Sequence, residues 1–322
     1  FSLVSASLFV FFFEIICLFQ QLKISEIFEF IKHFTSAINS TLVTMTNILL
    51  KKDIHLLSVD MTKEIDINII SIEIDIIYHL AAINGTELFY QIPYEVAMSN
   101  MLITINLLKF LEKKKAKKLI FSSTSEVYAG GYDLGLVNIP TDENVPVVFT
   151  QPTDNRFSYG ASKFMSEFLC LRFGEKFNTP VTIIRYHNIY GPRMGNKHVV
   201  PQLIKRLEQG ENPLEVFGSN ETRAFCYIDD AVEATKAVAI TDQINQEVVH
   251  IGNDREEITI SKLASLIIKN MNISCDLIHK NSKSSSVKRR CPNIDKLVNN
   301  TDFYPKISLE QGIKKTIDWY LK

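Results

Sequence analysis

The sequence predicts an α/β protein built on a doubly wound parallel sheet, with a smaller α/β lobe at its C-terminal end. Between residues 54 and 191, apolar runs of strand length alternate with longer segments whose apolar residues recur at helical spacing. The strand candidates are apolar throughout, which is typical of parallel strands covered on both faces. After residue 191 the elements become shorter, which indicates that a second lobe follows the sheet domain.

The first half of the chain supplies three strand candidates and two helix candidates. Helical spacing occurs at 28–34 and 95–116, and the second segment ends in lysines, which suit the negative end of a helix dipole. The apolar runs 54–60 and 74–82 are predicted strands, and 117–125 is a third because of its Leu-Ile-Phe centre.

The second half begins with a polar loop at 129–157, which contains Pro and Gly. A helix is predicted at 159–177 and a strand at 180–191. The predicted smaller lobe contains a helix at 198–210, a strand, turn and helix at 215–240, a helix at 256–269, a polar loop at 281–292 and a last helix at 308–322.

Composition excludes some classes of function. Lys and Arg number 35 and Asp and Glu 36, so the chain has no broad basic surface, and nucleic acid is excluded as the expected partner. An anionic ligand must therefore be held by a few placed residues. The cysteines are odd in number and form no CxxC pair, which predicts reduced thiols in a cytoplasmic protein and no metal site; they are Cys17, Cys170, Cys226, Cys275 and Cys291.

The N-terminal segment 2–19 is apolar apart from serines and Glu14. It approaches the length of a membrane span of about 20 residues, but a charge at the bilayer centre costs about 2.5 to 3.5 kcal/mol, so membrane contact is not favoured. The alternatives are a buried strand running into a helix, or an incomplete or misread first segment, because the chain opens with Phe1.

Tyr159 and Lys163 are four positions apart on a predicted helix, so their side chains share one face. An ammonium near a phenol lowers the phenol pKa from about 10 toward neutrality and makes the tyrosine a general base. The same spacing also occurs in solvated pairs of slight energetic value. Thr124, Ser125 and Glu126 favour the catalytic interpretation, because ligands lie outside the carboxyl ends of parallel strands.

Four motifs, "HLAA", "FSSTSEVY", "YGASK" and "RYHNIYGPR", occur in this order. From about residue 60 to 322 the chain resembles the extended short-chain dehydrogenases/reductases of the NAD-dependent epimerase/dehydratase family, which remodel nucleotide-diphosphate sugars. The resemblance implies a Rossmann-like NAD-binding domain over 1–185 that also receives about 224–253, and a nucleotide-sugar-binding lobe over 186–322. It also implies a homodimer formed through the helices that carry Asn100 and Tyr159.

By this resemblance, Thr124, Tyr159 and Lys163 match the catalytic triad, and Thr124 hydrogen-bonds the sugar hydroxyl that Tyr159 deprotonates. Glu126 matches a glutamate that acts after oxidation in sugar dehydratases and nucleotide-sugar decarboxylases. The implied reaction is epimerisation through a 4-keto sugar, with hydride passing to bound NAD. Decarboxylation or 4,6-dehydration using Glu126 is the alternative, since both branch from the same ketone.

The implied cofactor site is spread over several strand ends. Asp60 matches an acidic residue that approaches the adenine, and a cap of the following segment is the alternative interpretation. Small residues after the 74–82 strand allow close approach of the cofactor ribose, and Tyr186 matches a residue near the nicotinamide. The full set is Asp60, Leu80, Ala81, Ala82, Ser122, Tyr159, Lys163 and Tyr186.

The implied substrate site uses Arg223 and Arg290 on the diphosphate, because two guanidiniums can bind one diphosphate through bidentate contacts. Asn100 matches an asparagine that steadies the sheet, and His187 is interpreted as a satisfied core residue. The full substrate set is Asn84, Gly85, Thr86, Asn188, Arg223 and Arg290.

The glycine-rich loop of such a site is missing. A strand, a GxxGxxG turn and a helix should open the domain, because glycines let the backbone reach the pyrophosphate. The first glycine of this chain is Gly85. A catalytically impaired member that only binds sugar nucleotides is therefore a second hypothesis beside the enzyme.

Overall fold

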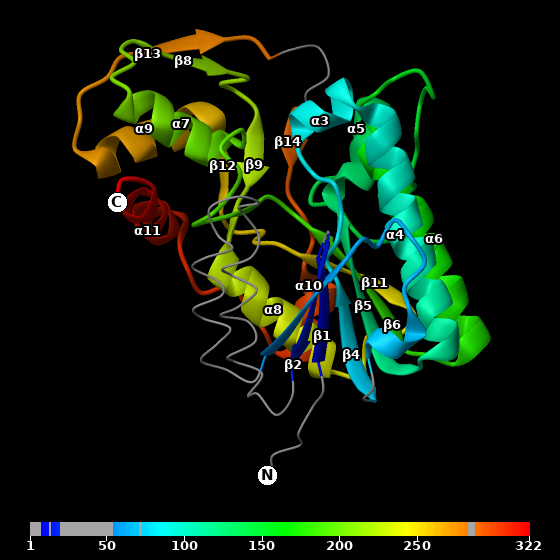
Figure 1. Cartoon of the computed structure of the whole chain (residues 1–322). Helices are drawn as coiled ribbons and strands as arrows, with labels where there is room; N and C mark the ends of the chain where they lie inside the picture. Colours follow the sequence, from blue (N-terminus) through cyan, green and yellow to red (C-terminus); the bar gives the residue numbers. More distant parts are fainter. Residues whose placement is uncertain (1–7, 13, 20–53, 71–72, 283–286) are drawn as a thin grey trace.

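A computed structural model describes residues 8–12, 14–19, 54–70, 73–282 and 287–322. It confirms the predicted α/β fold, built on a seven-stranded sheet whose order is β11-β6-β5-β4-β1-β2-β3 (Figure 1). In chain order these strands are β1 (Leu8–Phe12), β2 (Glu14–Phe19), β3 (Ile54–Val59), β4 (Ile74–His79), β5 (Ala116–Thr124), β6 (Val181–Tyr186) and β11 (Glu247–Ile251).

The sheet is parallel from β11 through β6, β5 and β4 to β1. β2 runs antiparallel to both β1 and β3, and Phe12 pairs with Ile15 where β1 turns into β2. The alternative in which the N-terminal strand runs into a helix does not hold over 14–19, where Ile15, Ile16 and Phe19 favour a second strand. The helix predicted at 28–34 lies outside the described residues.

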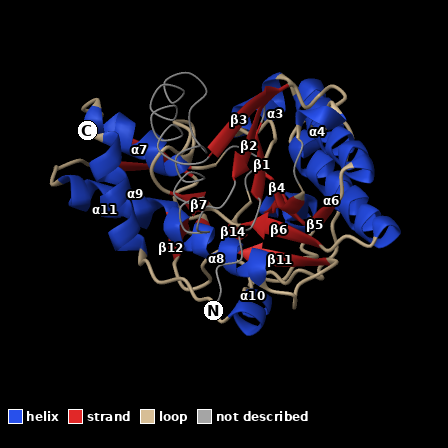
Figure 2. Cartoon of the chain, turned by 60° about the horizontal axis from the view of Figure 1, so that its bottom comes forward, coloured by secondary structure: helices blue, strands red, loops and turns tan. Residues whose placement is uncertain are grey.

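Helices cover both faces of the sheet (Figure 2). On one face lie α4 (Pro93–Lys113) and α6 (Phe157–Phe177), which pack with β4, β5 and β6 around a core that contains Leu107, Leu119 and Ile183. On the other face lie α8 (Ile228–Ile240) and α10 (Asp295–Thr301), whose core includes Ile184, Val249 and Leu297. This arrangement is the doubly wound layering that the alternation predicts.

The smaller lobe has its own apolar core, formed by α7 (Val199–Glu208), α9 (Ile260–Met271) and α11 (Leu309–Tyr320). Its strands form three short sheets, β10-β7, β12-β9-β14 and β13-β8. Their bounds are β7 (Ile189–Tyr190), β8 (Leu214–Phe217), β9 (Thr222–Ala224), β10 (Cys226–Tyr227), β12 (Glu257–Thr259), β13 (Leu277–Lys280) and β14 (Arg289–Arg290). The predicted domain boundary at residue 185 stays a prediction.

Two segments differ locally from their predictions. The strand predicted at 180–191 is divided into β6 and β7, because Asn188 has a left-handed φ of 45° that interrupts the extended backbone. The loop predicted at 129–157 contains a short helix, α5 (Ala129–Asp133). Three further short helices are η1 (Ile67–Ile69), α3 (Thr86–Gln91) and η2 (Ser125–Tyr128). No helix in the described part of the chain is long and apolar enough to cross a bilayer.

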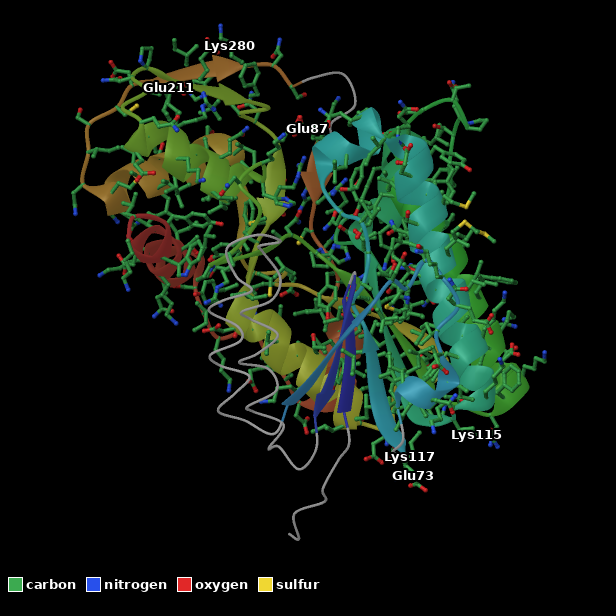
Figure 3. All side chains as sticks on the ribbon, in the orientation of Figure 1. Glu73, Glu87, Lys115, Lys117, Glu211 and Lys280 are labelled. Atoms are coloured by element: carbon green, nitrogen blue, oxygen red, sulfur yellow. The ribbon has the colours of Figure 1, made fainter. Side chains whose placement is uncertain are left out.

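The two lobes are joined at α3 by an ion pair. Glu87 extends from α3 on the side of the smaller lobe (Figure 3), and its carboxylate pairs with Lys197, just ahead of α7. Both side chains are partly solvent-exposed, so this contact links the lobes without contributing much stability.

Candidate active site

The candidate site begins where β5 ends. Thr124 is the last residue of β5, and its hydroxyl accepts a hydrogen bond from the backbone N–H of Glu126 at 3.2 Å. This contact caps η2 and turns the chain immediately after the strand. The predicted cluster of polar side chains therefore lies at the carboxyl end of a central parallel strand.

Tyr159 lies in the first turn of α6 and is buried. Its ring stacks on Phe89 of α3, with the ring centroids 4.7 Å apart and the ring planes 8° from parallel. Burial raises the pKa of Tyr159, and the negative charge of Glu126 raises it further, while a hydrogen bond with Thr124 lowers it. The structure thus brings Thr124 and Tyr159 together. Sequence reasoning missed Phe89, which carries no motif.

Gly160 lets α6 approach the strand end. A Cβ atom on this glycine would lie 3.0 Å from the backbone oxygen of Glu126, which is too close for any larger residue without movement of the backbone. The glycine of the "YGASK" motif therefore brings Tyr159 close to Thr124.

Lys163 lies one turn after Tyr159 and is 2% exposed. Its ammonium lies 4.1 Å from the centroid of the Phe121 ring, and burial lowers its pKa to about 8 against the opposing charges of Cys170 and Glu167. No hydrogen bond joins Lys163 to Tyr159 among the described residues. The shared helix face is present, but the direct contact that would stabilise a phenolate is not.

Glu126 meets the smaller lobe through Arg290. The Arg290 Nη1 atom lies 2.5 Å from the Glu126 Oε1 atom. Burial raises the pKa of Glu126, but Arg290 and two further arginines outweigh burial and hold that pKa below its usual value. Glu126 is therefore ionised at neutral pH.

Arg223 and Arg290 are neighbours on adjacent parallel strands, since they pair in the register of β9 and β14. Burial and the charge of Arg290 lower the pKa of Arg223 to about 10, although Glu221 contacts Arg223 at 3.0 Å. The Nε atom of Arg290 is buried and has no hydrogen-bond partner among the residues that the structure describes. Two adjacent guanidiniums, one with an unused buried donor, are suited to an anionic ligand.

Asn188 and Tyr186 make internal contacts. The Asn188 amide donates to the backbone oxygen of Ala224 at 3.1 Å, which ties Asn188 to the strand of Arg223. The hydroxyl of Tyr186 lies 2.8 Å from that of Thr235, and burial raises the Tyr186 pKa to about 12. Each side chain is half-buried.

The residues predicted to face a cofactor ribose follow β4. Ala81 is buried, Leu80 packs on the core beneath α8, and Ala82 packs beside Tyr159. Asn100 accepts a hydrogen bond from the backbone N–H of Ile83 at 2.7 Å. It therefore steadies the loop after β4, which agrees with the structural role expected of it.

Other predicted residues lie around the rim. Asn84 is exposed, and Gly85 has a φ of 142° at the start of α3, a conformation that favours glycine. The side chain of Thr86 lies outside the described residues. Ser122 is half-buried near the end of β5. His187 is buried and packs against the rings of Tyr128 and His250, which agrees with the packing role expected of it, although neither ring nitrogen has a hydrogen-bond partner among the described residues.

Asp60 follows β3 and is exposed. Its carboxylate accepts hydrogen bonds from the backbone N–H and the hydroxyl of Thr62 at 3.0 and 2.6 Å, and it pairs with Lys63 at 3.1 Å. These contacts lower the Asp60 pKa, the hydrogen bond with the Thr62 side chain having the largest effect. Asp60 therefore closes a turn and is not the helix cap of the alternative interpretation, because the next helix, η1, is capped by Asp66.

A doubly wound sheet with a threonine at one strand end, a buried tyrosine beside it and a nearby glutamate paired with an arginine is typical of ligand-binding α/β proteins. Residues 31–252 match the family described as NAD dependent epimerase/dehydratase family. The chain belongs to this family.

Relatives place the chain among enzymes of nucleotide sugars. It is 35% identical over 255 residues to UDP-N-acetyl-alpha-D-glucosaminuronate decarboxylase of Bacillus cytotoxicus, covering 76% of each chain. It is 27% identical to UDP-glucuronate 4-epimerase of Thermodesulfobacterium geofontis, covering 76% of this chain and 72% of the relative. The solved UDP-glucuronic acid 4-epimerase of Bacillus cereus, in complex with UDP-glucuronic acid and NAD, matches with a TM-score of 0.75 and 27% identity; the match covers 90% of this chain and 89% of that one.

The described residues fit one end of NAD and not the other. Near the reacting end, Thr124 and Tyr159 are joined, and small residues follow β4. At the pyrophosphate end, β1 passes into β2 with one residue between them, so no helix N-terminus follows β1 there. No glycine precedes Gly85 either. Among the described residues at this strand, the backbone therefore lacks the helix N-terminus that holds a pyrophosphate in such a fold.

Proposed function

We propose that this protein is a 4-epimerase of a UDP-linked hexuronate, working through a 4-keto sugar. The observation that carries the proposal is that Thr124 at the end of β5 and Tyr159 of α6 lie beside Glu126, which pairs with Arg290, the strand neighbour of Arg223. A diphosphate on the two arginines leaves the sugar free to extend toward Tyr159. The sugar class is supported by the names of the decarboxylase and epimerase relatives, which are enzymes of UDP-linked uronates.

The residues of this chain have distinct parts in the proposed reaction. Thr124 orients the sugar O4 hydroxyl, and Tyr159 accepts its proton as C4 becomes a ketone. NAD, when bound, supplies the hydride acceptor. Because burial raises the pKa of Tyr159, the phenol needs a positive charge beside it to lose its own proton. The proposal requires that Lys163, which shares this helix face but makes no hydrogen bond to Tyr159 among the described residues, comes close enough to supply that charge.

Glu126 favours epimerisation over reactions that need an acid. Its pKa is held low and its carboxylate is bound to Arg290, so it has no proton to donate near neutral pH. An ionised Glu126 instead holds Arg290 in place beside Arg223. In the enzymes that this chain resembles, the matching glutamate acts on the ketone after oxidation. In this proposal Glu126 instead positions Arg290 for binding the diphosphate.

A decarboxylase is the second candidate, and the 35% identical relative favours it. A 4-keto hexuronate is a β-keto acid, which loses carbon dioxide readily, so both reactions diverge from one intermediate. The binding-only protein is the candidate of another class, and the missing glycine loop favours it.

One experiment separates these candidates. The protein, with NAD added, is incubated with UDP-glucuronate, UDP-N-acetylglucosaminuronate, UDP-glucose and GDP-mannose, and products are followed by proton NMR. We expect the C4 epimer of a uronate without release of carbon dioxide. A UDP-pentose product identifies the decarboxylase. Binding without conversion identifies the binding protein, and no binding contradicts the proposal altogether.

We also propose that two copies pair through α4 and α6. Large apolar side chains are exposed on these two helices, although their opposite faces are buried against the sheet; they are Tyr94, Met98, Met165 and Phe168. Such a surface is suited to an isologous contact, in which one patch meets its own copy. Sedimentation of the protein should give twice the mass of the chain, and Phe168→Glu should return it to the mass of one chain.

A further inference from the structure

A chain of buried hydrogen bonds runs behind the site, from α6 to the segment that carries Arg290. It starts at Glu167, which accepts two hydrogen bonds from Arg185: Nε to Oε1 at 2.9 Å and Nη2 to Oε2 at 2.6 Å. The Ser123 hydroxyl also donates to Glu167. All three side chains are buried, so the ion pair is bidentate and sheltered from solvent.

The chain continues through Tyr128 and His250. The Arg185 Nη1 atom lies 2.5 Å from the Tyr128 hydroxyl, which lies 2.7 Å from the His250 Nε2 atom. On the other side of the ring, the His250 Nδ1 atom lies 3.1 Å from the backbone oxygen of Asn293. Tyr128 and His250 have no solvent exposure.

The donors in this chain can point in only one direction. A guanidinium donates and never accepts, so the Tyr128 oxygen accepts from Arg185 and its single proton goes to the His250 Nε2 atom. The His250 proton is therefore on Nδ1, where it is donated to the Asn293 carbonyl. Burial and the charge of Arg185 lower the His250 pKa to about 3, which agrees with a neutral ring.

The hydrogen-bond series ends at Asn293, which is close to Arg290 in sequence and in space. The backbone N–H of Asn293 donates to Thr141 at 2.7 Å, and the backbone N–H of Thr141 donates to Cys291 at 2.8 Å. These bonds pin the two residues that flank Pro292 immediately after Arg290. The guanidinium of Arg290 then meets Glu126.

We propose that Tyr128 and His250 are positioning residues for Arg290. They hold residues 291–293 through one directed hydrogen-bond chain, so that the Arg290 guanidinium faces the diphosphate of a bound nucleotide sugar. The identity of the ligand rests on the proposed function. The positioning of residues 291–293 by Tyr128 and His250 does not depend on it. Neither residue needs to touch substrate for this role.

The test compares two removals of a buried tyrosine hydroxyl. Tyr128→Phe breaks the chain, whereas Tyr190→Phe removes a hydroxyl that donates to the Leu309 backbone at 3.2 Å in the smaller lobe. In urea-free buffer, hydrogen–deuterium exchange of 289–293 should rise in Tyr128→Phe and stay unchanged in Tyr190→Phe. The Kd for UDP should rise roughly ten-fold in Tyr128→Phe, the size expected for one lost hydrogen bond to a charged group.

A spectroscopic signature makes the test independent of folding of the variant. In the wild-type chain, ¹⁵N NMR should find His250 neutral at pH 7 with its proton on Nδ1. A proton on Nε2 overturns the proposal, and so does unchanged exchange of 289–293 in Tyr128→Phe. If wild-type protein fails to bind millimolar UDP, the proposed function is contradicted, while the exchange and NMR results still decide the positioning role.

Discussion

The end of β5 and the β1–β2 hairpin belong to the same sheet but differ in what they offer a ligand. At β5, Thr124 and Tyr159 are joined, and Gly160 allows α6 to lie against the strand end. At β1, the chain turns back as an antiparallel strand, without a glycine or a helix N-terminus there. The residues expected to transfer the proton and the segment expected to hold the pyrophosphate therefore belong to separate parts of the chain, and only the first keeps the groups that the family resemblance calls for.

The largest expected effect comes from removing the Tyr159 hydroxyl. Tyr159→Phe should lower turnover of the active UDP-uronate by about a thousand-fold, the middle of the range for a general base. The fold should persist, because the stacking on Phe89 needs only the ring. Tyr94→Phe, at an exposed tyrosine, is the control and should leave turnover unchanged. Equal activity of the two variants would assign the proton transfer to another residue.

The β1–β2 hairpin, which has no glycine turn and no helix directly after β1, predicts weak NAD binding. Loss of two charge-assisted hydrogen bonds from backbone to phosphate should weaken the affinity roughly a hundred-fold. We expect NAD to be lost on gel filtration, as measured by absorbance of the denatured protein, while the Bacillus cereus epimerase run in parallel serves as reference. Retention of one NAD per chain would show that other residues hold the pyrophosphate.

Arg290→Gln should weaken binding of UDP by about thirty-fold, because it removes one guanidinium of the pair and leaves the half-buried Glu126 carboxylate without this partner. The neighbouring Arg289 is about half exposed and pairs with Glu257, so Arg289→Gln is a matched control. Calorimetric titration with UDP measures both. Equal loss in the two variants would indicate general electrostatic attraction and no defined clamp.

The smallest predicted effect concerns Lys163. Its pKa of about 8 in the folded chain lies below that of an unfolded lysine, so the unfolded chain binds more protons between about pH 8 and 10 and stability rises with pH in that window. Lys163→Met should remove about 1.5 kcal/mol of this rise between pH 8 and 9.5.

Urea unfolding at several pH values measures the effect of Lys163→Met. Lys115→Met, at an exposed lysine just before β5, should keep the wild-type slope. If both variants unfold with the same pH dependence as the wild-type chain, Lys163 is not buried in its charged form.

Periodicity and strand-end chemistry predicted much of the site. Local apolar patterns predicted a strand that ends at Thr124 and a later helix that carries Tyr159, and the structure has both. The partners of these residues came from remote segments. Phe89 on α3 gives no sequence signal for its stacking on Tyr159, because any apolar residue fits the helical pattern there.

The sequence by itself determined the alternation of strands and helices, the polar strand end and the absence of an early glycine, since each depends on neighbouring residues alone. Only the tertiary structure decided that Arg290 meets Glu126 and that Lys163 lies over Phe121. It also decided that buried hydrogen bonds run from Tyr128 through His250 to Asn293, close after Arg290. The physical reason is that contacts between distant residues depend on how whole elements pack, and a local pattern carries no record of which partner will be adjacent.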